Sequence, residues 1–227
     1  MSTEAVPRLD RRHLRRAETI EQLIDVAVDV MAEQGVAGLS LGEVARRMGI
    51  RPPSLYAYFP SKNAVYDAVF ARGWREVRQT MEAYAEPEPG VDLHDYLRGL
   101  AEVFVRWNLE HPVYAQLMLW RPVPGYVPSD EAYEPAVQVI ARAQDVLGQL
   151  QSRGLFRPDV EVDELVRSWT IVTTGVLTQQ LANAPDDAFA EGAFTTLLPQ
   201  LVAMYQAHYA PGEKRAPTRR VRHADQR

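Results

Sequence analysis

Helical periodicity recurs along this chain from residue 10 to residue 209, and patterns typical of β-strands are scarce. In the first helical segment, from about Asp10 to Gln34, apolar residues return at intervals of three and four, and Gly35 follows as a stop. Such a stripe buries one face of a helix against other helices. The sequence therefore predicts an all-α fold of nine helices, at about 10–34, 41–48, 53–59, 61–86, 93–110, 112–119, 130–154, 162–184 and 185–209.

Composition limits the chemistry that is open to the chain. Its 227 residues contain no cysteine, which excludes a disulfide framework, a thiolate zinc site and a cysteine nucleophile. No histidine has a metal-type spacing partner, and there is no glycine-rich phosphate loop or G-x-S-x-G elbow. We see no signal peptide, and the charge-free stretches at 168–185 and 192–212 are interrupted by polar residues and proline. We therefore expect a cytoplasmic protein without a membrane span, metal, cofactor or catalytic residues.

The net charge of −5 is divided unevenly along the chain. Residues 1–78 carry 12 Lys/Arg and 10 Asp/Glu, residues 79–210 carry 7 and 18, and residues 211–227 carry 6 and 2. A mildly basic head on an acidic body is expected when one end of a protein meets phosphate. Uneven surface charge without a function is the alternative.

The stretch GIRPPSLYAYFPSK, at residues 49–62, predicts a short helix between prolines. Ser40 followed by Glu43 is a capping box that starts the preceding helix, and Gly49 suits its left-handed stop. Pro53 suits the first position of the short helix. Two helices joined by such a tight turn, with a longer helix before them, are typical of a helix-turn-helix.

One face of the short helix is predicted to be small and exposed. At 100° per residue, Leu55 and Phe59 lie together on the buried side, whereas Pro53, Ser54 and Ala57 point away from it. Such a face can enter a major groove, where Ser54 can bond to a base edge and the other two can contact thymine methyl groups.

Charged and aromatic residues border this face. Tyr56 and Tyr58 lie on its two flanks, where their hydroxyls can reach phosphate or their rings can pack against the protein. Lys62, at the start of the fourth helix, is expected beside a phosphate because its charge and the helix dipole act together.

Residues 17–77 resemble the DNA-binding domain of the tetracycline-repressor (TetR) family of bacterial transcription regulators. The stretch LSLGEVARRMGIRPPSLYAYFPSKNAVYDAVF carries the resemblance, through Ser40, Ala45, Gly49, Ser54, Leu55, Tyr56, Phe59, Ser61 and Lys62. The resemblance implies a repressor that binds a palindromic DNA operator as a homodimer and is released by a small-molecule effector. It implies DNA contacts by Arg51, Pro52, Pro53, Ser54, Tyr56, Tyr58 and Lys62. Ala57, on the exposed face, is also a predicted DNA-contacting residue.

One departure from the family pattern is Gly42, which stands where members often place a DNA-contacting side chain. Specificity is therefore expected to depend on Arg51, on DNA shape and on the N-terminal arginines. These arginines either bind DNA or remain idle in solvent: Arg8, Arg11, Arg12, Arg15 and Arg16.

The chain is predicted to divide into a basic arm (1–16), the helix-turn-helix domain (17–77), a ligand-binding and dimerisation domain (78–210) and a disordered basic tail (211–227). The two charge-free stretches predict helices that pack on a second copy, with a monomer that buries both helices internally as the alternative. The expected interface residues are Thr174, Thr178, Phe194, Leu197, Leu198, Leu201 and Tyr205.

Aromatic residues concentrate in the middle helices and in the loop RPVPGYVPS at 121–129. They can line an apolar pocket, with this loop as a lid, or they can form plain core. The candidate ligand residues are Trp107, Tyr114, Met118, Trp120, Tyr126, Tyr133, Trp169 and Thr173. Two other functions remain open at this point, namely a helical adaptor that binds protein and, with less support, an all-α enzyme.

Overall fold

The computed structural model describes residues 10–84, 87 and 90–211, and this part of the chain is all-α. It contains nine α-helices and two short 3₁₀ helices, η1 (Val36–Gly38) and η2 (Thr195–Leu197). The arm up to residue 9 and the tail from residue 212 lie outside the described residues. The α-helices are α1 (Asp10–Gln34), α2 (Leu41–Arg47), α3 (Pro52–Tyr56), α4 (Lys62–Glu82), α5 (Leu93–Glu110), α6 (Pro112–Leu119), α7 (Asp130–Ser152), α8 (Val162–Asn183) and α9 (Leu198–Tyr209).

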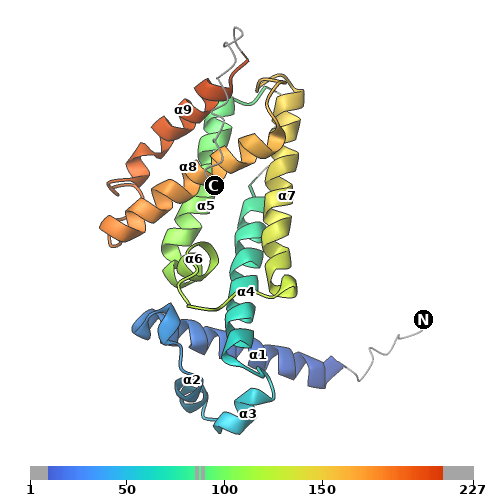
Figure 1. The fold of residues 1–227 in the computed structure, drawn as a ribbon, viewed down its shortest axis with the longest axis vertical. Coiled ribbons are helices and arrows are strands. Elements are labelled where there is room, and N and C mark those ends of the chain that lie inside the picture. Colours follow the sequence, from blue (N-terminus) through green and yellow to red (C-terminus); the bar gives the residue numbers. More distant parts are fainter. Residues whose placement is uncertain (1–9, 85–86, 88–89, 212–227) are drawn as a thin grey trace, which may run out of the picture.

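The first three helices form a helix-turn-helix unit at one end of the molecule (Figure 1). Gly35 ends α1 in the left-handed region, with φ at 79°, and Gly49 does the same after α2, with φ at 67°. The Ser40 hydroxyl accepts a hydrogen bond from the Glu43 backbone N–H at 3.4 Å, as the capping box predicts.

The short third helix differs from its prediction at both ends. It includes Pro52, one residue earlier than expected, and it ends at Tyr56 instead of Phe59. The first turn of a helix needs no backbone N–H, so two prolines in succession are accommodated there. The backbone N–H groups of Tyr58 and Phe59 still bond to the Leu55 carbonyl, which continues the turn after the helix.

Helix α4 connects this unit to the rest of the molecule (Figure 1). The Ser61 hydroxyl caps its start at 3.1 Å from the Ala64 backbone nitrogen. The helix then runs without a break through residue 77, the expected domain boundary, and contacts α1, α5, α6 and α7. Its end at Glu82 comes before the predicted end at residue 86.

The buried residues form two clusters. One joins α1–α4 with α6 and the start of α7, and the other joins α5, the end of α7, α8 and α9. Met81 on α4 and Phe104 on α5 pack against both clusters, so the seam between the two clusters passes these side chains.

The predicted ninth helix, at 185–209, is wrong in its first half. The chain between Asn183 and η2 is not helical, and α9 begins only at Leu198. Pro199 explains the start, because proline is tolerated only in the first turn of a helix. The buried Gln180 side chain holds the connection: it accepts from the backbone N–H groups of Phe194 and Thr195.

Among the described helices, none is both long and apolar enough to cross a membrane.

Candidate DNA-binding and ligand sites

The outward face of α3 lies open to solvent, as its periodicity predicts. Pro53, Ser54 and Ala57 are exposed, whereas Leu55 and Phe59 are buried in the core of the helix-turn-helix unit. Arg51 and Pro52 are also exposed. The surface is therefore a small, nearly flat patch with a cation at the start of the short helix.

The two tyrosines that flank this face differ in exposure. Tyr56 is 52% exposed, so its ring is not a core residue. Tyr58 is half-buried: it packs against the first core cluster, and the guanidinium of Arg16 lies over its ring at 4.9 Å from the centroid. Arg16 also donates a hydrogen bond to the Ala57 backbone oxygen at 3.0 Å. This arginine, predicted as part of a loose arm, belongs to α1 and fixes the end of α3 against it.

Lys62 stands in the first turn of α4, beside the same face. Its Nζ donates to the Ala37 backbone oxygen at 3.1 Å and lies 5.5 Å from the centroid of the Tyr66 ring. One hydrogen bond uses only one of the three ammonium donors, so the position of the charge is fixed while donors remain.

A network of ion pairs fixes α2 relative to α1. Arg47 bonds to Glu33 on α1 and, at 2.7 Å, to Glu43 on its own helix, which also accepts from Arg46. Hydrogen bonds from Arg46 and then Arg47 lower the pKa of Glu43 from 4.5 to about 2. The network holds the orientation of α2, against which α3 packs.

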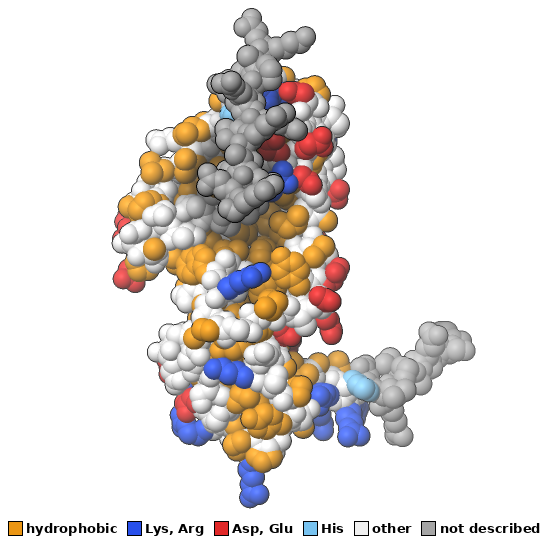
Figure 2. Space-filling view, viewed as in Figure 1, with side chains coloured by type: hydrophobic (Ala, Val, Ile, Leu, Met, Phe, Trp, Pro, Cys, Tyr) orange, Lys and Arg blue, Asp and Glu red, His pale blue; other side chains and the backbone are white. Residues whose placement is uncertain are grey.

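The charges follow this division of the molecule. In Figure 2 the basic side chains gather at the end that carries α1–α3, and acidic side chains cover the flank that carries α7. This distribution agrees with the uneven charge of the sequence. A polyanion would therefore be attracted to the helix-turn-helix end and repelled by the α7 flank.

A cavity of about 70 Å³ lies among α4, α5, α7 and α8. Two predicted ligand residues, Trp169 and Thr173, line it. Its wall contains no charged side chain, and it includes the seam residues Met81 and Phe104. The complete lining is Trp74, Met81, Phe104, Leu119, Val139, Ile140, Ala143, Trp169, Thr170, Thr173 and Thr174.

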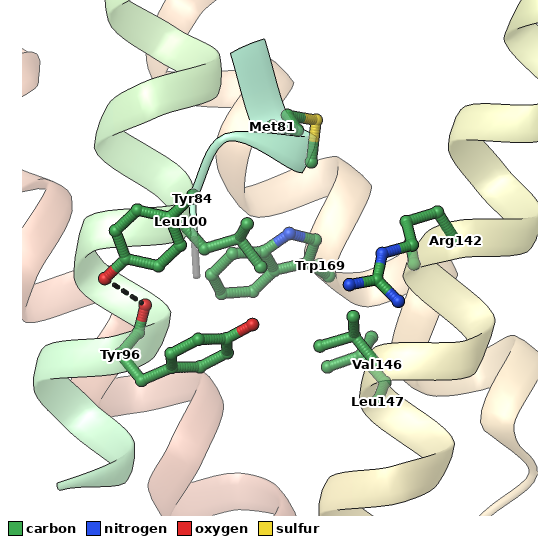
Figure 3. A pocket seen from close by; sticks show the side chains of 9 residues that line it. Met81, Tyr84, Tyr96, Leu100, Arg142, Val146, Leu147 and Trp169 are labelled. Atoms are coloured by element: carbon green, nitrogen blue, oxygen red, sulfur yellow. Dashed lines mark hydrogen bonds between the residues drawn. The ribbon is translucent and has the colours of Figure 1, made fainter. Parts of the chain in front are cut away.

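A smaller cavity of about 30 Å³ adjoins the first and shares Met81, Ala143 and Trp169 with it. Figure 3 shows Tyr96 from α5 and Arg142 from α7 directing their polar ends toward this space, with Trp169 between them. The Tyr84 hydroxyl donates to the Tyr96 backbone oxygen at 3.4 Å. The second cavity is therefore the more polar of the two.

The other candidate ligand residues lie outside these two cavities. Trp107, Tyr114, Met118 and Tyr126 are buried in the first core cluster. Trp107 stacks on His111 with centroids 4.4 Å apart, and burial raises the pKa of Tyr114 to about 12. Tyr114 and Met118 are core because α6 packs against α1 and α4, and Trp107 on α5 and Tyr126 on the following loop belong to the same cluster. Trp120 and Tyr133 are exposed, and Tyr133 stacks on Phe70.

The loop at 121–129 does not line either cavity and is held against α4 instead. The Asp67 carboxylate accepts from the Tyr126 hydroxyl at 2.9 Å and from the Ser129 backbone N–H at 3.2 Å. Burial, and then the bond to Asp67, raise the pKa of Tyr126. The sequence suggested a lid, but the loop holds the start of α7 against the N-terminal half of α4.

An apolar groove of about 410 Å³ runs along the outer side of α8 and α9. Ile171 is 71% exposed and Met204 is 66% exposed at this groove, which also includes the predicted interface residue Leu201. Phe194 is half-buried and Leu197 is exposed nearby in the sequence.

Three of the predicted interface residues are buried or engaged elsewhere in the protomer. Leu198 is 0% exposed, whereas Tyr205 lines the groove but is only 5% exposed. Thr174 lines the cavity, and Thr178 accepts a hydrogen bond from the Trp120 indole at 3.2 Å. The absence of charge did not separate the outer face of α8 and α9 from the inner one, and the interface stays a prediction.

The site residues that the sequence did not suggest include Trp74, Met81, Phe104 and Ile171. Ile171 is an ordinary apolar residue in a helical stretch, and only its exposure distinguishes it, whereas Met204 was expected to supply interface area. Trp74 belongs to the apolar stripe of α4, so its position gave no signal of a cavity.

Two family models match the chain, one over its helix-turn-helix end and one over its helical body. The model described as "Bacterial regulatory proteins, tetR family" matches residues 23–69, and the model described as "Tetracyclin repressor-like, C-terminal domain" matches residues 97–205. The chain belongs to the TetR family of bacterial transcription regulators. The first match spans the helix-turn-helix unit and the start of α4. The second match includes most of the residues of α5, α7 and α8 that line the two cavities.

Relatives of this TetR-family chain are distant. An HTH-type transcriptional regulator of Mycobacterium bovis is 22% identical over 62% of this chain and 60% of its own length. The class D tetracycline repressor protein of Escherichia coli is 29% identical over 50% of this chain and 48% of its own. Among solved structures, the transcriptional regulator FadR of Bacillus subtilis in complex with stearoyl-CoA has a TM-score of 0.67 at 15% identity, and covers 82% of this chain and 97% of that one. The last similarity is one of fold.

Proposed function

We propose that this protein is a DNA-binding transcription regulator that binds a palindromic operator as a homodimer. The exposed face of α3 carries the proposal: Ser54 and Ala57 lie open to solvent, with Arg51 and Lys62 at its margins. A small surface of this kind fits a major groove, and its margins reach the phosphates. Two copies related by a twofold axis would meet successive grooves about 34–36 Å apart.

The regulator is proposed to be a repressor that a small apolar or aromatic effector releases from DNA. The cavity among α4, α5, α7 and α8 supports this, because its apolar, uncharged wall lies at the seam between the two core clusters. The fold relative in complex with stearoyl-CoA gives further support, since a similar fold binds a ligand that carries a long apolar acyl chain. Both cavities are smaller than the ~300 Å³ typical of ligand sites, so binding must widen them.

Helix α4 provides a route from the cavity to the DNA. Its 21 residues span about 31 Å at 1.5 Å per residue, with cavity residues near one end and Lys62 at the other. A tilt of roughly 5° would displace the DNA end by about 3 Å, which is close to the 3.4 Å rise of one base pair. A small change at the cavity is then sufficient to spoil the fit to two grooves.

Selection of operators from a random duplex library tests DNA binding directly. We expect a palindrome, and we expect affinity for it to fall steeply with salt, by ~0.9 log units per phosphate contact that is neutralised. Lys62→Ala should weaken binding and reduce the salt slope by about 1, because one phosphate contact is lost. Tyr58→Ala should also weaken binding.

Arg75→Ala is the matched control for the lysine variant. Arg75 is an exposed cation on the same helix, 13 residues further on, so its removal should leave the salt slope unchanged. If neither Tyr58 nor Lys62 affects affinity, α3 does not enter the groove. If the selection recovers no operator sequence and the protein binds no duplex at low salt, a protein-binding adaptor is the better explanation.

A further inference from the structure

Trp74 has a buried N–H group without a hydrogen-bond partner. The residue lies on α4, is only 9% exposed and forms part of the wall of the larger cavity. Its indole Nε1 is fully buried and meets no acceptor among the residues that the structure describes. Buried donors in folded proteins are nearly always paired, so an unpaired donor in a cavity wall points to a partner that comes from outside the chain.

The three threonines of this wall cannot take that place. Thr170, Thr173 and Thr174 donate their hydroxyl hydrogens to backbone oxygens of α8, at 2.9, 3.1 and 2.6 Å. Toward the cavity these hydroxyls retain only acceptor capacity. Two wall residues carry an indole donor, Trp74 and Trp169, and the Trp74 donor is the one that is both fully buried and unpaired.

We propose that the effector is an uncharged, mainly apolar molecule whose carbonyl oxygen accepts a hydrogen bond from Trp74 Nε1. This rests on the proposed effector response and specifies its chemistry. A ketone, ester, lactone or amide would supply the acceptor. A carboxylate would not suit the larger cavity, because that wall contains no cation and burying an unpaired charge is costly.

The two cavities set the direction in which such a ligand extends. Met81 and Trp169 stand between them, and methionine is a flexible side chain that adapts to what it packs against. A carbonyl at Trp74 would leave the apolar remainder of the ligand pointing past Met81 toward the smaller cavity. Any second polar group of the ligand would then lie near Tyr96 and Arg142 (Figure 3).

Two probes of nearly equal shape test the hydrogen bond. 4-Phenyl-2-butanone carries the carbonyl, and isopentylbenzene replaces its oxygen with a methyl group. Binding of each to the DNA-free protein is measured by equilibrium dialysis, with the wild type, Trp74→Phe and Trp107→Phe. Trp107 is a buried tryptophan outside both cavities and serves as the matched control.

We expect Trp74→Phe to weaken binding of the ketone by roughly threefold to tenfold, the worth of one net hydrogen bond, and to change hydrocarbon binding by less than about twofold. Trp107→Phe should alter neither. The proposal is overturned if the ketone does not bind, or if Trp74→Phe affects both probes equally.

Indole NMR provides a second readout should Trp74→Phe fail to fold. The four tryptophans give four indole ¹H–¹⁵N signals, which single Trp→Phe variants at the other positions assign by exclusion. The ketone should move the Trp74 signal downfield, and the hydrocarbon should not. A ketone that binds without moving this signal contradicts the proposal. Both measurements are made without DNA, so they test the hydrogen bond and not the switch. If the ketone binds at Trp74 but does not release the protein from its operator in a separate titration, only the switch is disproved.

Discussion

Arg16 performs two tasks at the DNA-binding end, because it packs on Tyr58 and bonds to the Ala57 carbonyl. Arg16→Ala should therefore weaken operator binding at least about fivefold, since a cation–π contact at an exposed site contributes ~0.5–1 kcal/mol and a charged hydrogen bond adds to it. Arg12→Ala removes an exposed charge from the same helix without these contacts and should have a smaller effect. Fluorescence anisotropy with the selected operator measures both. Equal losses would indicate that Arg16 acts by charge alone.

Glu43 makes the helix-turn-helix sensitive to acid. Its pKa is lowered to about 2 by Arg46 and Arg47, so the carboxylate stabilises the folded state above about pH 4.5 and this contribution disappears as the pH falls toward 2. The melting temperature of the wild type should exceed that of Glu43→Gln at pH 6, and the difference should shrink between pH 4.5 and 2. Glu18→Gln controls for the loss of one exposed charge. A difference that stays constant over this range would exclude the ionised network as its cause.

At the scale of elements, Gly73 sets how closely α4 and α6 approach. A Cβ at this position would lie 2.5 Å from Met118 Sδ and 2.7 Å from Tyr114 Cδ1, whereas a Cβ at Gly148 on α7 would meet Val162 at 3.8 Å. Gly73→Ala should lower the melting temperature by roughly 2–4 °C, because overpacking by ~1–3 kcal/mol exceeds the gain in helix propensity of about 1 kcal/mol. Gly148→Ala should raise it, since the added methyl fits. Thermal unfolding followed by circular dichroism compares the two variants. A higher melting temperature for both would show that α6 shifts easily to make room for the added methyl group.

The sequence predicted the ends of those helices that are fixed by residues close to them in the chain. Ser40, Ser61 and Gly49 fix helix ends through local caps and a left-handed turn, so these boundaries were accessible. The stretch at 184–197 was not, because the buried Gln180 from α8 holds its backbone, and this contact joins residues 14 and 15 positions apart. The outward face of α3 followed from helical periodicity alone.

The ligand site was harder to predict than the DNA-binding face, for a related reason. Aromatic residues such as Trp107 and Tyr114 have the same spacing whether they form core or line a pocket, and here both are buried in the first core cluster. Trp74 reveals its role only through the missing partner of its N–H group, which depends on the packing of four helices. Composition and period carry no such information.

For the whole molecule, the position of the larger cavity matters more than its size. Met81 and Phe104 line it and also pack against both core clusters, so a ligand that widens the cavity separates the two clusters. Salt bridges from Arg72 to Asp25 and Glu21 fix α4 to α1, and Asp67 fixes it to the loop before α7. In the proposed switch, movement of α4 would therefore be passed on to the helix-turn-helix unit instead of being lost within the body.

The outer groove of α8 and α9 is where a second copy would attach if the protein is a dimer. Ile171 and Met204 expose more apolar surface there than an isolated protomer has reason to keep, and stable interfaces bury about 800 Å² on each partner. Ile171→Glu and Met204→Glu would each place two unpaired charges in a twofold interface, one from each copy. We expect both variants to sediment as monomers in analytical ultracentrifugation at micromolar concentration, where the wild type sediments as a dimer.

Val127→Glu is the control for this substitution, because Val127 is also highly exposed but lies on the loop before α7. It should leave the dimer intact. The monomeric variants should lose affinity for the full palindrome while binding a single half-site as the wild type does, because each α3 face remains whole. If both glutamate variants remain dimeric, the two copies meet through another surface, and the spacing of the two recognition helices must be derived from that surface instead.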